Sequence, residues 1–241
     1  MVYRVLSDYI VRLIAARLAG DIVLSDKPGK AMRKWREFFG LTQTEVARAM
    51  GIAPSVVSEY ESGRRTPGTR FLKQYVKALL KLDAERGWPS IKRLSNVIIP
   101  LSEGVVDIRE LEVPVAIDKL IAVVKGALLT SMPLARNIYG YTVLDSLVAI
   151  ESMSGNDFWR IMGTTTERAL IFTRVSTGRS PMIAVRVAPV KPAVVILHGT
   201  KRVDPLAIKL AELDGIPLVL SLAEGIEDLI TGLKSLTFAS S

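Results

Sequence analysis

The segment Gln43–Ser62, with the sequence QTEVARAMGIAPSVVSEYES, constrains the fold most strongly because it predicts two short helices joined by a tight turn. Ala47 is small where two helices would cross closely, and Gly51 stands where the turn needs a residue that tolerates positive φ. Val57 and Tyr60 are three residues apart, which turns the second helix back to the same core. The spacing is typical of a helix-turn-helix unit.

This segment and its flanks, about Lys30 to Asp83, resemble the phage repressor/Cro-like helix-turn-helix family. Ala53 departs from the family pattern, where a Ser or Thr cap is more usual, and Pro54 partly compensates by fixing φ at the first helical position. The resemblance implies a domain that binds double-stranded DNA, whereas the plainer alternative is a helical hairpin with no nucleic-acid role. The matching positions are Gln43, Ala47, Gly51, Ser55, Val57, Glu61 and Gly63.

Charge is distributed unevenly along the chain. Residues 1–90 carry 16 Lys and Arg against 9 Asp and Glu, a net charge of +7, while the remainder carries 16 against 15, a net charge of +1. Almost all of the formal charge of +8 therefore lies with the motif, as expected of a domain that faces phosphates. A generally basic proteome is the alternative explanation of the charge.

Composition and the absence of certain motifs narrow the classes of protein to which the chain could belong. A length of 241 residues with 49% apolar residues suits one large or two medium domains. The absence of cysteine excludes disulfides and thiolate metal sites and favours a cytoplasmic protein. No apolar run approaches the ~18 residues of a membrane span. Phosphate-binding and nucleophile-elbow motifs are missing and there is one histidine, so we expect no catalytic residues, no metal and no cofactor.

The order of elements predicts an α+β, multidomain chain: an N-terminal all-α helix-turn-helix domain followed by a C-terminal α/β domain. Residues 1–84 form the expected DNA-binding domain, with helices at 2–19, 31–39, 43–50, 54–62 and 69–82. Residues 85–110 are expected to be a linker with a short helix at about 90–98. Residues 111–241 form the expected regulatory or dimerisation domain, with helices at 115–129, 143–150, 157–162, 204–213 and 224–236 and strands at 169–175, 182–187, 193–198 and 217–221.

The expected DNA contacts fall into two groups. With Val57 inward, a step of ~100° per residue turns Ser55, Glu59 and Ser62 outward. Val56 and Ser58 then lie on the flanks. The family resemblance places Pro54, Ser55, Ser58 and Glu59 opposite base edges. Val56, on the flank, completes the first group because it could touch a thymine methyl group. The second group is expected to bind phosphates, with Gln43, Arg64 and Arg65 as its main members and Lys30, Lys34 and Arg36 as helpers.

Two polar loops of the C-terminal half predict a small pocket for an anionic effector. The first loop, Ser176–Pro181, contributes Gly178 and the donor-rich Arg179, and the second follows an expected strand at His198. A simple hairpin turn and a structural histidine are the alternatives. The expected pocket residues are Thr177, Gly178, Arg179, Ser180, His198, Gly199 and Thr200.

Taken with the helix-turn-helix, Gly29-Lys30, Trp35-Arg36, Gly63-Arg-Arg65 and Gly178-Arg-Ser-Pro181 resemble a family of predicted archaeal transcriptional regulators. The resemblance implies DNA binding and no particular ligand. The preferred interpretation is a sequence-specific DNA-binding transcription regulator with a C-terminal effector-sensing or dimerisation domain. Because one recognition helix reads few base pairs, a homodimer is expected. The alternatives are a protein-bridging transcription cofactor with the same fold and an enzyme whose chemistry lies in the C-terminal domain.

Overall fold

A computed structural model describes residues 2–98, 104–153, 157, 161–162 and 165–236 of the chain. The chain divides into two compact units, which we describe separately. The N-terminal unit is Ser7–Pro100, and the C-terminal unit is Leu101–Ser241 together with Met1–Leu6. None of the helices in the described part of the chain has both the length and the apolar character that a membrane span requires.

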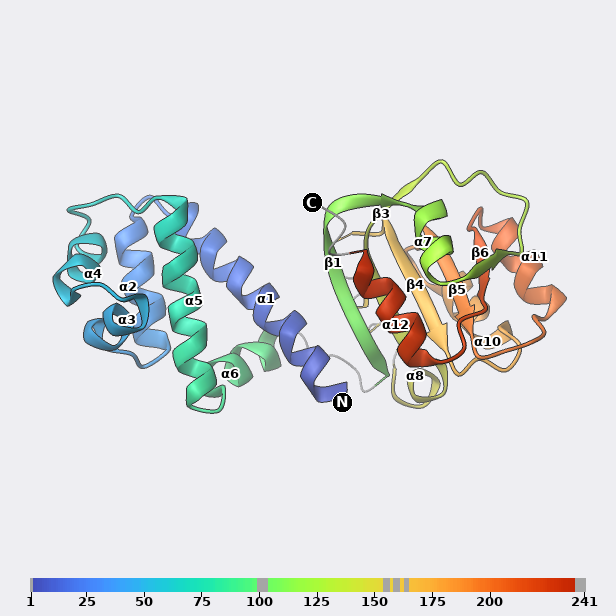
Figure 1. The fold of residues 1–241 in the computed structure, drawn as a ribbon, viewed down its shortest axis with the longest axis horizontal. Coiled ribbons are helices and arrows are strands. Elements are labelled where there is room, and N and C mark those ends of the chain that lie inside the picture. The colour runs from blue at the N-terminus through green and yellow to red at the C-terminus, as the bar shows by residue number, and fades with distance from the viewer. Residues whose placement is uncertain (1, 99–103, 154–156, 158–160, 163–164, 237–241) are drawn as a thin grey trace. The chain divides into compact units, whose positions relative to one another are not determined.

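The N-terminal unit is helical (Figure 1). Its helices are α1 (Val2–Val23) from Ser7 onward, α2 (Pro28–Phe38), α3 (Gln43–Met50), α4 (Pro54–Glu61), α5 (Thr69–Glu85) and α6 (Pro89–Ile98). Every one of them was expected from the sequence, with ends shifted by a few residues. They surround one apolar core, whose fully buried members include Ile14, Met32, Val46, Val57 and Leu79.

Local chemistry sets the ends of α3 and α4. The Thr42 side chain accepts a hydrogen bond from the Glu45 N–H, and the Glu45 carboxylate accepts one from the Thr42 N–H at 2.7 Å, which forms a capping box. Gly51 ends α3 in the left-handed region with φ 68°. Ala53 gives α4 no side-chain cap, and Pro54 stands at its first turn. The turn therefore has the geometry that the sequence predicts.

The C-terminal unit contains a six-stranded sheet in the order β1-β3-β4-β5-β6-β2. Its central strands β3, β4, β5 and β6 are parallel, and β1 and β2 pair antiparallel with β3 and β6 at the two edges. The strands predicted at 193–198 and 217–221, on either side of the helix predicted at 204–213, are the parallel neighbours β5 and β6. The strands are β1 (Val105–Ala116), β2 (Gly126–Leu128), β3 (Asn137–Asp145), β4 (Arg168–Thr173), β5 (Val194–His198) and β6 (Leu218–Ser221).

Helices cover both faces of this sheet, so its central strands are buried on both sides. On one face α7 and α12 lie together and pack on alternate strand residues such as Ile171 and Ile196 (Figure 1). The intervening residues, such as Phe172, face α8, α10 and α11 on the other side. The helices are α7 (Ile117–Val123), α8 (Ser146–Ser152), α10 (Arg179–Val187), α11 (Pro205–Leu213) and α12 (Ile226–Ser235).

One expected strand is a helix. Residues 182–187 lie in α10, where Met182 and Val185 are buried while Ile183 and Val187 are exposed. Burial at a spacing of three residues is helical, and the short run of branched side chains hid that spacing.

Other boundaries also differ from the sequence predictions. Only 117–123 of the expected helix 115–129 is helical, since β1 precedes it and β2 follows it. The expected helix 143–150 begins at Ser146, because β3 runs to Asp145. The expected linker is shorter, since β1 begins at Val105. The expected helix 157–162 falls largely outside the described residues.

Candidate nucleic-acid interface

Helix α4 presents a polar face outward from the N-terminal unit. Val57 is fully buried, and Tyr60 stacks on Phe71 with ring centroids 3.8 Å apart. On the other side Pro54, Ser55 and Ser58 are exposed, while Val56 and Glu59 are half-buried. The residues expected to read bases therefore lie together on the accessible side of α4.

A buried polar network fixes the C-terminal end of α4. Both carboxylate oxygens of Glu61 accept from the Arg36 guanidinium, at 2.7 Å from Nε and 2.8 Å from Nη2. The Gln43 amide donates to Glu61 at 2.9 Å, and the Tyr75 hydroxyl lies 3.1 Å from the same carboxylate. Arg36 also donates to the Leu41 carbonyl at 2.7 Å. The network joins α2, α3, α4 and α5, so it holds α4 at a set orientation.

Electrostatics in this network favour the charged form of Arg36. The hydrogen bond from Arg36 to Glu61 raises the guanidinium pKa above its ordinary value. Burial, together with the Glu61 carboxylate, raises the pKa of the Tyr75 hydroxyl, which therefore stays neutral. The expectation that Arg36 contacts a phosphate does not fit this geometry, because its guanidinium is buried and its donors are already bound.

The other residues expected to bind phosphates differ in their availability. Lys34 is exposed but bonded to Asp21, and Arg65 forms an ion pair with Glu59 at 2.8 Å. Lys30 and Arg64 are exposed, and their side chains have no partner among the described residues. Lys30 and Arg64 are therefore the members of this set that are immediately free to receive a phosphate.

A hollow of about 290 Å³ lies between the start of α2 and the loop after α4. Lys27, Lys30 and Arg65 line it together with the acidic residues Asp26 and Glu61, and Lys27 was not among the residues expected to bind phosphates. At Gly29 a Cβ atom would come within 2.2 Å of the Tyr60 carbonyl oxygen, so only glycine permits this approach of α2 to α4. The requirement for glycine thus sets where this hollow lies relative to α4.

Comparison with known proteins places this geometry in a family. A helix-turn-helix family model matches residues 32–80. An uncharacterized HTH-type transcriptional regulator of Archaeoglobus fulgidus is 50% identical over 212 residues, covering 87% of this chain and 92% of the relative. The chain belongs to this family of archaeal HTH-type transcriptional regulators. A second member, from Methanocaldococcus jannaschii, is 46% identical over 211 residues, which cover 86% and 88% of the two chains. No solved structure matches the chain.

In this regulator the two loops expected to form an effector pocket do meet. The Asp204 N–H donates to the Thr177 carbonyl at 2.9 Å, and the Thr200 hydroxyl donates to the Ser176 carbonyl. Arg179 forms an ion pair with Asp204 at 2.8 Å, so its guanidinium is already engaged.

The remaining residues of that expected pocket point to different surroundings. His198 is only 5% exposed, and burial lowers its imidazole pKa. Gly178 and Gly199 both adopt positive φ and approach Leu197 and Arg174 closely. Ser180 instead lines a groove beside α8. The predicted loops are neighbours, but their side chains do not converge on one polar centre.

Proposed function

We propose that this DNA-binding transcription regulator recognises a specific double-stranded operator as a homodimer, with α4 in the major groove. The observation that carries the proposal is the exposed polar face of α4, anchored at its end by the buried Arg36–Glu61 network. A rigid helix that presents short polar side chains suits the major groove, where base edges display distinct donors and acceptors.

The side chains on that face suggest separate roles. Ser55 and Ser58 are small hydroxyl donors and acceptors that suit several bases, and Glu59 suits the amino group of cytosine. Val56 suits contact with a thymine methyl group, while Pro54 fixes the start of the helix.

Lys30 and Arg64 are the main proposed phosphate-binding residues. Both side chains are exposed and unengaged among the described residues. Arg65 joins them if it leaves Glu59, and Gln43 contributes from the first turn of α3. These contacts would set the register of the protein on the duplex without reading sequence.

Dimerisation would give the protein two copies of α4, matching half-sites about one helical turn apart, roughly 34 Å. The C-terminal unit is the proposed seat of effector sensing, dimerisation or both. Light scattering of the full chain, with and without DNA, tests this part: a monomer under both conditions would reject the homodimer.

Selection of bound DNA from random sequence tests operator recognition. We expect wild type to enrich a pseudo-palindromic site and Glu59→Ala to lose preference at one position in each half-site. Glu37→Ala is a matched control, since Glu37 is an exposed carboxylate on α2 that pairs with Arg33. If wild type enriches no sequence, operator recognition fails and the protein-bridging alternative gains support. If Glu59→Ala selects the wild-type site, Glu59 is not a reader.

A further inference from the structure

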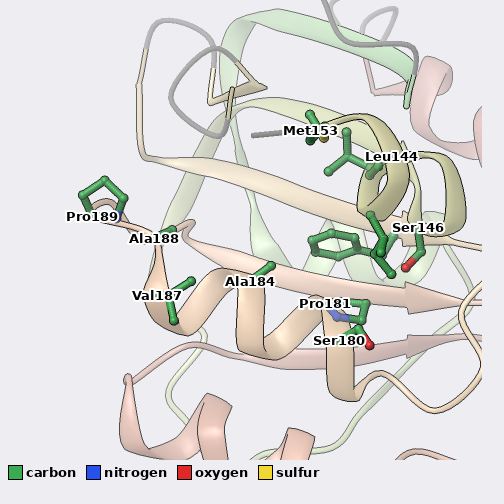
Figure 2. Close-up of a pocket in the computed structure, with 12 residues that line it drawn as sticks. Leu144, Ser146, Met153, Ser180, Pro181, Ala184, Val187, Ala188 and Pro189 are labelled. Atoms are coloured by element: carbon green, nitrogen blue, oxygen red, sulfur yellow. The ribbon is translucent and has the colours of Figure 1, made fainter. Parts of the chain in front are cut away.

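A groove of about 280 Å³ opens in the C-terminal unit between α8 and α10, on the face of the sheet opposite α7 and α12. Leu144 of β3 and Phe172 of β4 line it from the sheet side. Figure 2 shows Ser146 and Ser180 toward one end of the groove and Pro189 at the other. The volume lies just below the roughly 300–1,000 Å³ typical of small-molecule sites, so it suits a small ligand.

The walls of the groove are apolar and partly open to solvent. Met153 and Ala184 line it, together with Ile150 and Val187, which are 61% and 77% exposed. Exposed apolar side chains gathered at a concave surface are a common sign of a binding site. The groove follows α10 from Ser180 to Val187, about 10 Å at ~1.5 Å per residue, which suits an acyl chain of roughly eight carbons.

The serine end is polar and offers hydrogen-bond donors. Ser146 is 5% exposed, yet its hydroxyl has no hydrogen-bond partner among the described residues. Ser180 is exposed, and neither its hydroxyl nor its backbone N–H has a partner there. Gly178 precedes α10 and provides no side-chain cap, so the first turn of α10 keeps free N–H groups. Helix α8 differs, because Asp145 caps it through the N–H groups of Leu147 and Val148.

Charge at this end is complementary to an anion. The first turn of α10 contains no acidic residue. Its free N–H groups stand at the positive end of the helix dipole, which favours an anion. The neighbouring carboxylate of Asp145 is bound by Arg174 at 2.9 Å in addition to its capping bonds. The polar end therefore presents two hydroxyls and unsatisfied N–H groups beside a carboxylate that is already neutralised.

We infer that this groove binds a small amphipathic carboxylate, such as a medium-chain acid, as an effector of the regulator. The carboxylate accepts from Ser146, Ser180 and the start of α10, and the alkyl chain lies against Phe172, Ala184 and Val187. The inference rests on the proposed function in assigning the ligand a sensing role. It differs from a purely polar effector pocket because most of the ligand surface is apolar.

Calorimetric titration of the full chain with straight-chain acids and their alcohols tests this assignment. From butyrate to octanoate we expect affinity to rise about threefold to fourfold per methylene, as apolar burial predicts. We expect octanoate to bind at least tenfold more tightly than octanol, since hydrogen bonds to a charged group are the stronger ones. Equal binding of octanol and octanoate, or no binding of octanoate, would overturn the inference.

Substitutions in the groove locate the binding. Ala184→Trp fills the groove and should abolish octanoate binding, and Val187→Glu places a carboxylate beside the alkyl chain at an exposed position that folding tolerates. Ser146→Ala with Ser180→Ala should weaken octanoate about tenfold and leave octanol unchanged. Ser152→Ala is the matched control, because its hydroxyl, also on α8, bonds to the Val148 carbonyl. Wild-type affinity in Val187→Glu and in the double serine variant would overturn the site.

Two further measurements separate the other outcomes. Light scattering of Val187→Glu tests whether a second copy of the chain occupies the groove instead of a ligand. If Val187→Glu no longer forms a dimer and the wild type does not bind octanoate, the ligand assignment is overturned. DNA selection by wild type, run with and without octanoate, tests the proposed function separately. Octanoate binding by a protein that selects no DNA would uphold the site and reject the operator.

Discussion

Both units bury an arginine, and the surroundings of the two residues differ. In the N-terminal unit Arg36 pairs with Glu61, and both side chains are withdrawn from solvent, with exposed fractions of 10% and 2%. In the C-terminal unit Arg168 is completely buried and donates to the carbonyls of Tyr141 and Arg109, while its carboxylate partner Glu110 is 33% exposed. One pair joins the helices around α4, and the other joins β1, β3 and β4 at the edge of the sheet.

The difference in solvent exposure predicts how much free energy of unfolding is lost when each pair is broken. Removing one member of a fully buried pair leaves a charge without water or a partner, whereas a partner that reaches solvent can be hydrated. Breaking the buried pair of the helix-turn-helix should therefore cost more free energy of unfolding than breaking the pair at the sheet edge, whose carboxylate can be hydrated.

The largest effect should follow from Glu61→Gln. Because Arg36 would keep its charge in a buried site, we expect the free energy of unfolding of the N-terminal unit to fall by about 3–5 kcal/mol. Hydrogen exchange of the full chain measures this by the loss of protection in α2 to α5. Glu59→Gln, on the exposed side of the same helix, should change it by less than about 0.5 kcal/mol. Similar losses in the two variants would contradict the comparison.

Arg168→Met should have a smaller effect confined to the C-terminal unit. The carbonyls of Tyr141 and Arg109 would lose donors, while Glu110 could turn to water, so we expect a loss of about 2 kcal/mol. Exchange should rise in β1 and β3 and stay unchanged in α3 and α4. Arg136→Met, which removes an exposed ion pair with Glu167, serves as control. A loss as large as that of Glu61→Gln would show that solvent access does not separate the two pairs.

Arg64 of the N-terminal unit, whose side chain has no partner among the described residues, should affect DNA binding and not stability. Arg64→Ala should weaken binding to all sequences and reduce the slope of log affinity against log salt by about one. Its unfolding free energy should stay within about 0.5 kcal/mol of wild type. Arg33→Ala removes an exposed arginine of α2 that pairs with Glu37, and should leave the slope unchanged. An unaltered slope in Arg64→Ala removes Arg64 from the phosphate contacts.

The smallest expected effects are changes in stability with pH, which should differ between the two units. Burial lowers the pKa of His198 below 6.5, so the unfolded chain binds the proton more readily and the C-terminal unit loses stability as pH falls below about 6.5. Hydrogen bonds from Thr42 lower the pKa of Glu45 below 4.5, so its contribution to α3 is present above pH 4.5 and disappears only in more acidic solution.

Hydrogen exchange between pH 7 and 4 measures the two contributions in one experiment. His198→Gln should flatten the pH dependence of the C-terminal unit below pH 6.5 and leave that of α3 unchanged. Equal acid sensitivity of His198→Gln and wild type would show that the imidazole contributes nothing.

The N-terminal unit was predictable from its sequence because its signals are local. Thr42, Gly51 and Pro54 fix helix ends within a few residues, and the spacing of Val57 and Tyr60 orients α4. The burial of Arg36 was not predictable, since it depends on Glu61, 25 residues away. A basic residue next to a tryptophan in an amphipathic helix looks the same whether it faces solvent or a buried carboxylate.

The C-terminal unit was less predictable because its strands depend on distant partners. The sequence did not predict β1, β2 or β3, and each of them is stabilised by pairing that no local window contains. The parallel strands β4, β5 and β6 were found because strands buried on both faces form continuous apolar runs. Ser146 had no sequence signal, since its position in the groove depends on the contact of α8 with β3.

The pairing of β2 with β6 affects how the nascent chain folds. Gly126–Leu128 must wait for Leu218–Ser221, more than ninety residues later, before that edge of the sheet can close. The hydrogen bonds that join Glu61 to α2, α3 and α5 span only 14 to 25 residues, and units rich in local contacts fold faster. At roughly 5–20 residues per second of synthesis, the helix-turn-helix unit has several seconds to fold before the last central strand leaves the ribosome. A folded helix-turn-helix unit would then precede completion of the sheet on every chain made.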